Sequence, residues 1–328
     1  MNFFLDPKWP RSPERIDHRQ KILSIGSCFT EHIGNALKEM KFTVLQNPNG
    51  ILFDPASVCH AMVSYIQNRH YTGDELFYLN ELWQSWQHHS RFSGTDKDAV
   101  LAEINQSVGE AHRFLKQTDW LIITLGSSFS YRLVAEGNRP VANCHRAPGQ
   151  WFHKHLMGIT ETIEALDNML HQLFYFNRSL RVIFTISPVR HIRDGVVENN
   201  RSKARLIEAV HHMVNKFNRL YYFPSYEWVI DVLRDYRFYD IDLVHPNFAA
   251  TQSVLEQFQE MFMSEETIAL AAEARRLANA RKHRPSHPDT DAHRRFLNAA
   301  GEKARQLSQQ YPFLDFSEDI RFFEAAQQ

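Results

Sequence analysis

Two candidate nucleophiles stand side by side in the segment KILSIGSCFT, residues 21–30. An apolar run ends there at Gly26, and Ser27 and Cys28 follow where a buried strand is expected to give way to a helix. A thiol at a helix N-terminus has a lowered pKa, because the backbone N–H groups there stabilise its anion. Either side chain could therefore attack an electrophile, although a tight turn around an inert, buried Cys28 is an equally simple interpretation.

An acid and a histidine late in the chain could activate such a nucleophile. Asp242 and His245, within DIDLVHPN (residues 240–247), are three residues apart. A turn can then place the carboxylate against one imidazole nitrogen while the other nitrogen faces a crevice, which is the base-and-orienter half of a catalytic triad. The D-x-x-H pattern is common by chance, so it indicates a catalytic role only in combination with the other candidate segments.

Two glycine-containing loops could stabilise an oxyanion. The turn Asn47-Pro48-Asn49-Gly50 follows the first strand–helix unit and can supply the backbone N–H of Gly50. Beyond a second apolar run, Gly126-Ser127-Ser128 again combines a glycine turn with small hydroxyl side chains. Each loop alone is an ordinary turn, but together with the nucleophile they predict one site.

Other polar residues predict substrate contacts rather than a metal. His145, within Asn143-Cys144-His145-Arg146, could line the crevice. Arg190 follows a third apolar run and could hold a substrate carboxylate or phosphate, or form an ion pair with Asp194. No C-x-x-C or H-E-x-x-H is present, so we predict no metal. No G-x-G-x-x-G follows the first strand and no P-loop motif occurs, so we predict no nucleotide cofactor.

The elements that must position these residues alternate along the chain. Continuous apolar runs predict buried parallel strands at 21–25, 120–125, 181–186 and 228–232. Helical patterns are expected at 31–40, 99–115, 160–176 and 202–220. This alternation predicts a doubly wound α/β sheet, in which ligands bind outside the carboxyl ends of the strands.

A change of composition divides the chain near residue 262. Residues 1–262 hold the predicted α/β domain, whereas residues 263–328 are rich in Ala, Arg, Glu and Gln with helical spacing, broken at 284–291 and 311–315. We expect a helical C-terminal extension whose apolar face packs on the sheet domain or on a partner chain, so a homo-oligomer is compatible with the sequence. Its charged runs, such as Arg275–Arg276, are expected to be solvated helix faces.

Composition disfavours several classes of function. The chain has 37 Lys and Arg against 38 Asp and Glu, which gives no electrostatic case for nucleic acid or an anionic membrane surface. Three distant cysteines do not form a disulfide framework and fit a reducing compartment. No run approaches ~18 apolar residues and no signal-peptide core is evident, so we expect a soluble, cytoplasmic protein with no membrane span.

The order of the candidate segments resembles that of the SGNH or GDSL hydrolases. Within that superfamily the chain is similar to the GSCFA family, whose motif reads here as Gly26-Ser27-Cys28-Phe29 with Thr30 in the last place. The resemblance extends over residues 20–250 and implies a three-layer, flavodoxin-like fold of SGNH type. It includes the turn Asn47–Gly50 and the segments VANCHRAPGQWF (141–152), TISPVRHIRDGVVENNRSK (185–203) and YFPSYEWVIDVLRDYRFYDIDLVHP (222–246).

Matching the residues to the superfamily changes the choice of nucleophile. Its first block reads Gly-Asp-Ser, so an ungapped match lays Ser27 on the Asp and Cys28 on the catalytic Ser. Cys28 is thus the nucleophile by register. Ser27 could take that role only if the turn shifted by one residue, and a third alternative is that neither residue is a nucleophile. Ser128 stands where the superfamily has an oxyanion-binding Asn, which weakens the expectation of vigorous hydrolysis. Asp242 and His245 match the fourth block.

The resemblance implies a hydrolase of acyl esters or thioesters that forms a covalent acyl-enzyme. Cys28 or Ser27 would attack the carbonyl, His245 would accept the proton, and Asp242 would fix the imidazole tautomer. The N–H groups of Cys28 and Gly50 would face the oxyanion. The expected substrate is a small-molecule or glycan-linked acyl compound. An acyltransferase on the same site and a non-catalytic ligand-binding module are the alternatives.

Overall fold

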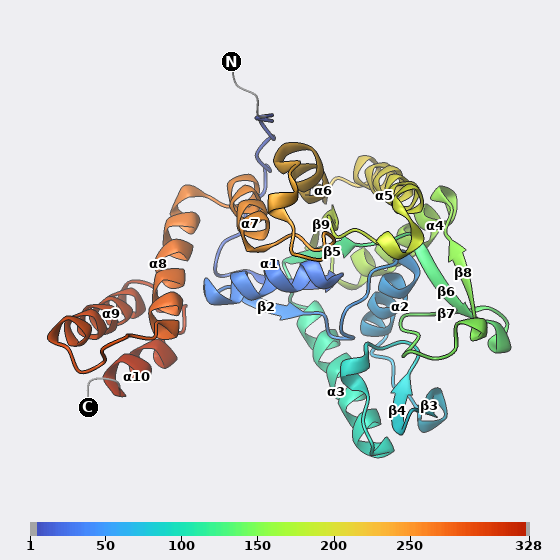
Figure 1. The fold of residues 1–328 in the computed structure, drawn as a ribbon, viewed down its shortest axis with the longest axis horizontal. Helices are drawn as coiled ribbons and strands as arrows, with labels where there is room; N and C mark the ends of the chain where they lie inside the picture. The colour runs from blue at the N-terminus through green and yellow to red at the C-terminus, as the bar shows by residue number, and fades with distance from the viewer. Residues whose placement is uncertain (1–4, 326–328) are drawn as a thin grey trace. The chain divides into compact units, whose positions relative to one another are not determined.

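A computed structural model describes residues 5–325 and contains a central five-stranded sheet (Figure 1). The strand order is β10-β9-β5-β1-β2, and the pairs β1–β5, β5–β9 and β9–β10 are parallel. The strands are β1 (Lys21–Gly26), β2 (Thr43–Gln46), β5 (Trp120–Leu125), β9 (Arg181–Ile186) and β10 (Leu220–Phe223). This is the predicted doubly wound, flavodoxin-like order, because the chain runs outward from β1 to one edge and then returns to build the other half.

The strands form where the sequence is continuously apolar. All six residues of β5 are buried, as are the last five of β1 and of β9. Strands covered on both faces need apolar residues at every position, which is why these runs do not alternate. The side chains of Leu23, Leu121 and Val182 point into one large hydrophobic core that also contains residues of four helices.

Four helices supply that core. They are α2 (Pro55–Ile66), α3 (Lys97–Leu115), α4 (Ile159–Phe176) and α5 (Val196–Lys216), and they agree with the predicted pattern except for α2, which the sequence analysis did not predict. Asp54 caps α2 by accepting the N–H of Ser57 at 3.0 Å, and Pro55 occupies the first turn. Two further helices, α1 (Cys28–Glu39) and α7 (Phe248–Phe262), follow the first strand and the D-x-x-H segment.

The predicted fourth strand is wrong. Residues 228–232 lie in a π-helix, η6 (Trp228–Leu233), which continues a short helix α6 (Ser225–Glu227). The strand is instead β10, eight residues earlier, and Pro224 follows its end. A short apolar run does not by itself distinguish a buried strand from a buried helical turn, so the period of hydrophobicity could not decide here.

Two small antiparallel sheets lie within the connections between strands of the central sheet. The hairpin of β3 (Leu76–Leu79) and β4 (Leu82–Ser85) follows α2. Beyond β5, the strand β6 (Phe129–Leu133) pairs with both β7 (Arg139–Val141) and β8 (Phe152–Leu156). The sequence analysis did not predict these strands, which are short and carry mixed polar and apolar residues.

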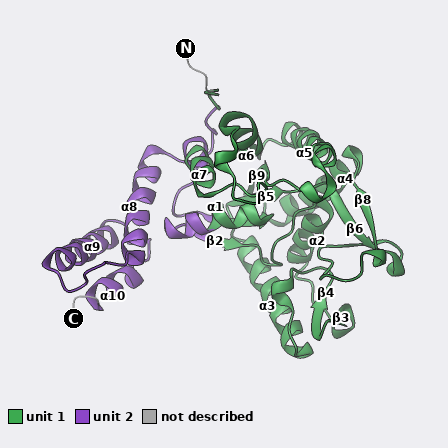
Figure 2. Cartoon of the chain, viewed as in Figure 1, with its two compact units in different colours: residues 1–9, 22–34, 44–257 green, residues 10–21, 35–43, 258–328 purple. Residues whose placement is uncertain are grey.

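The chain divides into two compact units (Figure 2). One comprises residues 1–9, 22–34 and 44–257, and the other comprises residues 10–21, 35–43 and 258–328. The second unit includes α8 (Glu265–Lys282), α9 (Asp291–Gln310) and α10 (Ser317–Ala325), which end and begin at the predicted breaks. The division into residues 1–262 and 263–328, and the packing expected of the extension, stay predictions.

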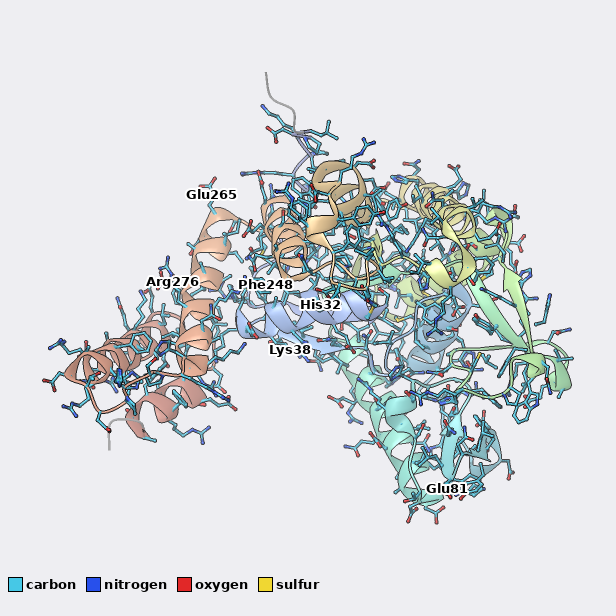
Figure 3. The ribbon with its side chains drawn as sticks, viewed as in Figure 1. His32, Lys38, Glu81, Phe248, Glu265 and Arg276 are labelled. Atoms are coloured by element: carbon cyan, nitrogen blue, oxygen red, sulfur yellow. The ribbon has the colours of Figure 1, made fainter. Side chains whose placement is uncertain are left out.

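The C-terminal helices have their own apolar contacts and a charged outer surface. Leu277, Leu307 and Phe323 belong to a separate hydrophobic core formed by α8, α9 and α10. Arg276 pairs with Glu273 one turn away while its side chain stays 74% exposed, as predicted for a solvated face (Figure 3). Within residues 5–325, no helix combines the length and apolar character required to cross a bilayer.

Candidate active site

The turn between β1 and α1 requires glycine at its first position. Gly26 has φ +148°, and a Cβ placed on it would lie 2.2 Å from the carbonyl oxygen of Thr124 on the neighbouring strand. The N–H of Gly26 donates to Oδ1 of Asn47 at 3.0 Å, and the N–H of Ser27 donates to the Thr124 carbonyl at 3.1 Å. The predicted Gly-Ser-Cys turn is therefore fixed between β5 and the loop after β2, with α1 beginning at Cys28.

Cys28 is the more accessible of the two candidate nucleophiles. Ser27 is only 4% exposed, and its hydroxyl is buried without a hydrogen-bond partner, whereas Cys28 is half-buried. The amide N–H groups of Phe29 and of Cys28 itself interact with the thiol, as expected at a helix N-terminus. The helix start thus presents the cysteine sulfur rather than the serine oxygen.

The pKa of the Cys28 thiol is raised, contrary to the expectation from its position at a helix start. Burial is the largest cause and outweighs the two backbone amides, which lower the pKa. Glu31 adds a raising effect, and the charge of Lys203 adds a lowering one. At neutral pH the sulfur is therefore a thiol, and attack on a carbonyl requires a base to remove its proton.

Asp242 and His245 form the hydrogen bond that their spacing predicts. Nδ1 of His245 lies 2.6 Å from Oδ2 of Asp242, while Oδ1 accepts the N–H groups of Val244 and His245 at 2.9 and 3.0 Å. These hydrogen bonds, that of the His245 side chain first, lower the pKa of Asp242 to about 2. Nearly half of each side chain is exposed, so the pair lies at the surface.

The segment that follows β9 holds the Asp242–His245 loop. The N–H of Arg190 donates to the carbonyl of Val244 at 3.2 Å, and its guanidinium lies 4.3 Å from the ring centroid of Tyr239. Arg190 does not pair with Asp194, whose carboxylate instead binds Lys154. The loop is therefore anchored at the carboxyl end of a central strand, the edge at which α/β sheets bind ligands.

The two predicted oxyanion loops are folded as turns, but their donors already have partners. The N–H of Gly50 donates to the carbonyl of Asn47 at 2.7 Å, which closes the Asn47–Gly50 turn. Ser128 is fully buried, and its hydroxyl donates to the carbonyl of Ser202 on α5 at 3.1 Å. The backbone N–H of Ser128 donates to the Ser202 hydroxyl at 2.7 Å. In this structure neither Gly50 nor Ser128 offers a free donor to an oxyanion.

The other candidate residues occupy structural positions. The amide of Asn47 is fully buried and its Oδ1 holds Gly26, although its Nδ2 has no partner. His145 is buried beside Trp86, and its Nε2 donates to the carbonyl of Ser85 at 2.8 Å. His145 therefore contacts the base of the β3–β4 hairpin, and no contact joins it to the nucleophile turn among the residues described.

Two residues at the strand ends were not predicted as site residues. Lys203, on α5, donates from Nζ to the carbonyls of Gly126 at 2.5 Å and Ser187 at 2.6 Å. Burial lowers its pKa to about 7, and the charge of Cys28 opposes that shift. The signal in the sequence was helical spacing: Lys203 lies on the same face of α5 as the buried residues Asn199 and Leu206.

His191 is the second unpredicted residue. A Cβ placed on Gly126 would lie 3.4 Å from Cβ of Ser27 and 3.6 Å from Nε2 of His191, so both side chains approach the same point. Burial, followed by the charge of Lys203, lowers the pKa of His191 to about 4, and the ring is therefore neutral at pH 7. His191 thus lies beside the nucleophile turn, at the carboxyl ends of the central strands.

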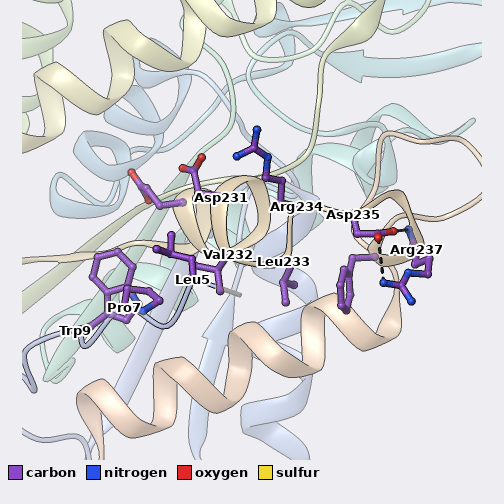
Figure 4. Close-up of a pocket in the computed structure, with 11 residues that line it drawn as sticks. Leu5, Pro7, Trp9, Asp231, Val232, Leu233, Arg234, Asp235 and Arg237 are labelled. Carbon is purple, nitrogen blue, oxygen red and sulfur yellow. Dashed lines mark hydrogen bonds and ion pairs between the residues drawn. The ribbon is translucent and has the colours of Figure 1, made fainter. Parts of the chain in front are cut away.

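A sizeable cavity is separate from this cluster. It has a volume of about 1000 Å³ and lies between the N-terminal residues Leu5–Trp9 and the segment 227–238 (Figure 4). None of the predicted site residues lines it. Within residues 5–325, no three His, Cys, Asp or Glu side chains gather in a way that could hold a metal ion.

Two family models match the chain. One is described as the GSCFA family and matches residues 21–258. The other is described as GSCFA domain protein, C-terminal domain, and matches residues 274–327. No curated protein matches the sequence.

Three solved carbohydrate esterases are similar to the chain at low identity. They are a family two carbohydrate esterase from Clostridium thermocellum in complex with cellohexaose (12% identity, TM-score 0.37), an acetyl xylan esterase from the rumen bacterium Butyrivibrio proteoclasticus (10%, 0.37) and a Clostridium thermocellum family 3 carbohydrate esterase (11%, 0.33). The matches cover 77%, 73% and 78% of this chain. They span 64%, 62% and 98% of the other chains, which is less than two thirds of the first two.

Proposed function

The chain belongs to the GSCFA family, and from this premise we propose that it is an SGNH-type hydrolase of acyl esters or thioesters. The observation that carries the proposal is the 2.6 Å hydrogen bond between Asp242 and His245. A carboxylate that accepts from Nδ1 fixes the neutral tautomer whose Nε2 can take a proton, which is the requirement for a general base. The loop that holds this pair is anchored at the carboxyl end of β9, on the sheet that also presents Cys28.

We infer the following sequence of steps. Sγ of Cys28 attacks the carbonyl carbon as Nε2 of His245 takes the thiol proton, and the carbonyl π electrons move to oxygen. The tetrahedral intermediate expels the alcohol or thiol, which takes the proton from His245, and a thioester on Cys28 remains. Water then attacks that thioester with His245 as base, releasing the acid and restoring the thiol. Because burial raises the pKa of Cys28, proton removal accompanies attack rather than preceding it.

The N-terminus of α1 supplies the donors for the oxyanion in this proposal. The backbone N–H of Cys28 belongs to the first turn of the helix, where N–H groups have no intrahelical partner. Gly50 and Ser128 are engaged elsewhere, so the proposal assigns the oxyanion to the helix start rather than to these two residues. The hydrogen bonds that occupy Gly50 and Ser128 also favour a second candidate function. In that alternative the protein is a ligand-binding module that kept the crevice and lost hydrolytic activity.

The test is a trapped acyl-enzyme. The protein is incubated with short-chain p-nitrophenyl esters, thioesters and acetylated sugars, quenched in acid and measured by intact mass. We expect one acyl adduct that is absent from Cys28→Ala and that forms about 10² to 10⁴ times more slowly in His245→Ala. Cys144→Ala, which removes another half-buried cysteine, is the matched control and should retain both adduct and turnover.

Three outcomes separate the alternatives. An adduct lost only in Ser27→Ala transfers the nucleophile to Ser27, and neutral hydroxylamine gives an independent assignment because it cleaves a thioester and spares an oxygen ester. A folded protein that forms no adduct and shows no turnover across the panel overturns the hydrolase in favour of the binding module. Adduct that passes to an added alcohol faster than to water identifies an acyltransferase.

A further inference from the structure

A second cavity lies between α2, the β3–β4 hairpin and β7. Its volume is about 350 Å³, and its walls come from the first half of α2, the turn after that helix, the end of β4 and β7. Small-molecule sites in proteins typically have volumes of about 300–1,000 Å³, so this cavity is large enough for a ligand. None of its described lining residues belongs to the proposed catalytic site. The cavity is therefore a candidate site in its own right.

Two arginines bring positive charge to this cavity. Arg69 and Arg139 both line it, and among the described residues that do so Glu75 is the only one with a carboxylate. Arg139 also pairs with Glu136 at 3.0 Å, but these side chains are 42% and 43% exposed, so water screens that pair. The cavity wall thus has one positive charge in excess.

Arg69 is oriented by fixed partners. Its Nη2 donates to Oε1 of Glu75 at 2.5 Å, and its Nη1 lies 3.3 Å from Nε2 of His60. A guanidinium can only donate, so Nε2 of His60 accepts and the ring carries its proton on Nδ1. Burial, followed by the charges of Arg69 and Arg139, lowers the pKa of His60 to about 4, so the ring is neutral at pH 7. The histidine therefore adds no charge at that pH, and Arg69 needs no rearrangement to meet a ligand.

A buried hydroxyl also lines the cavity. Ser57, in the first turn of α2, is 3% exposed, and its Oγ has no hydrogen-bond partner in the described part of the chain. Buried polar side chains are normally paired with a protein group or with ordered water. A hydroxyl without such a partner can donate to an acceptor that enters the cavity.

We propose that this cavity binds a small molecule through an oxyanion group, a phosphate or a carboxylate, which the guanidinium groups of Arg139 and Arg69 hold. The planar fork of an arginine presents paired N–H donors that match two oxygens of such a group. Glu75 opposes a second negative charge and can accept hydrogen bonds from ligand hydroxyls. The expected ligand is therefore a hydroxylated anion of low charge, such as a sugar phosphate or a sugar acid.

The experiment measures protection of Arg139 in the wild-type protein. Phenylglyoxal modifies accessible guanidinium groups, and peptide mass spectrometry gives the rate for each arginine. The probes are glucose 6-phosphate, gluconate and, as the neutral control, glucose. Each is used at about 10 mM, which nearly saturates a site with a Kd of about 1 mM and should slow modification of Arg139 about 10-fold.

Arg201 is the matched internal control in every sample. Like Arg139 it pairs with a glutamate three residues away, Glu198 at 2.8 Å, and its side chain is similarly exposed (54%). It does not line the cavity, so its rate should stay unchanged. Protection of Arg139 by glucose 6-phosphate alone assigns a phosphate ligand, and protection by gluconate alone assigns a carboxylate. Protection by neither anion, equal protection by glucose, or equal slowing of Arg201 overturns the proposal.

Variants test the same site by calorimetry. Arg139→Gln should weaken binding of the protecting anion about 10-fold or more, because a hydrogen bond to a charged group is lost. Arg139→Lys keeps the charge without the fork and should lose less. Arg201→Gln should bind as the wild type does, and unchanged affinity in a folded Arg139→Gln protein overturns the proposal. Neither experiment uses ester turnover, so this site and the proposed hydrolase can fail independently.

Discussion

Nδ1 of His245 lies 2.6 Å from Oδ2 of Asp242, in a loop where the same carboxylate also accepts two backbone N–H groups. One aspartate thus both shapes the turn and orients the imidazole. Leu243, between them, has φ +57°, which lets the chain reverse within three residues. The pair is therefore built almost entirely from its own local sequence.

Replacing Asp242 with Asn is expected to lower kcat/KM by about 10² to 10⁴ with little effect on stability. An amide cannot stabilise the imidazolium or select the same tautomer, whereas an exposed ion pair contributes little to folding. Turnover of the best ester from the panel and urea unfolding measure the two effects. Asp235→Asn is the control, because Asp235 likewise accepts the N–H of Arg237, two residues on, in an exposed turn. Equal losses in both variants would contradict the assigned role.

Gly26→Ala is expected to destabilise the α/β unit by about 3 kcal/mol or more. The new Cβ would lie 2.2 Å from the Thr124 carbonyl at a φ of +148°, so backbone strain and overpacking add together. Gly149→Ala is the matched control, since no atom lies within 4 Å of its added Cβ, and its effect should stay within about 0.5 kcal/mol. Urea unfolding of both variants measures the difference, and a similar stability for both would show that the turn relaxes.

Ser128→Ala is expected to affect folding more than catalysis. Its hydroxyl donates to the Ser202 carbonyl in a buried position, so loss of the bond should lower the free energy of unfolding by about 1–2 kcal/mol. Turnover should stay within about 3-fold of the wild type. A 10²-fold loss of kcat in a normally stable Ser128→Ala protein would instead indicate an oxyanion donor.

His88 makes the folded state sensitive to acid. Burial, followed by the charges of His60 and His145, lowers the pKa of His88 to about 3, against an ordinary value near 6.5 in the unfolded chain. A depressed histidine pKa contributes stability above pH ~6.5 that is lost as pH falls toward the folded value. Between pH ~7 and ~4.5 this loss should amount to about 2 kcal/mol.

Comparison of two histidine variants tests that dependence. Urea unfolding at pH ~7 and ~4.5 should show a smaller pH effect in His88→Gln than in the wild type, because glutamine does not titrate. His171→Gln, which removes an exposed histidine, should keep the wild-type dependence. Identical pH dependence in all three proteins would mean that acid acts through other groups.

The sequence predicted the features that depend on neighbouring residues. Continuous apolar runs located β1, β5 and β9, because a strand buried on both faces has no polar positions. The breaks at 284–291 and 311–315 located the ends of the C-terminal helices. Asp242 and His245 are three residues apart, so one turn was enough to bring them together. These features depend on residues that are close together in the sequence, so the sequence alone can predict them.

Tertiary structure decided which donors and charges surround the nucleophile. Ser128 and Gly126 are engaged by Ser202 and Lys203, which lie more than seventy residues later in the sequence. The helix start alone predicted a lowered pKa for Cys28, but burial raises it, and burial depends on the packing of the whole sheet edge. The sequence by itself determined the strands, the turn and the acid–histidine pair. Only the folded chain decided their electrostatic environment, because desolvation and charge depend on distances in space rather than along the sequence.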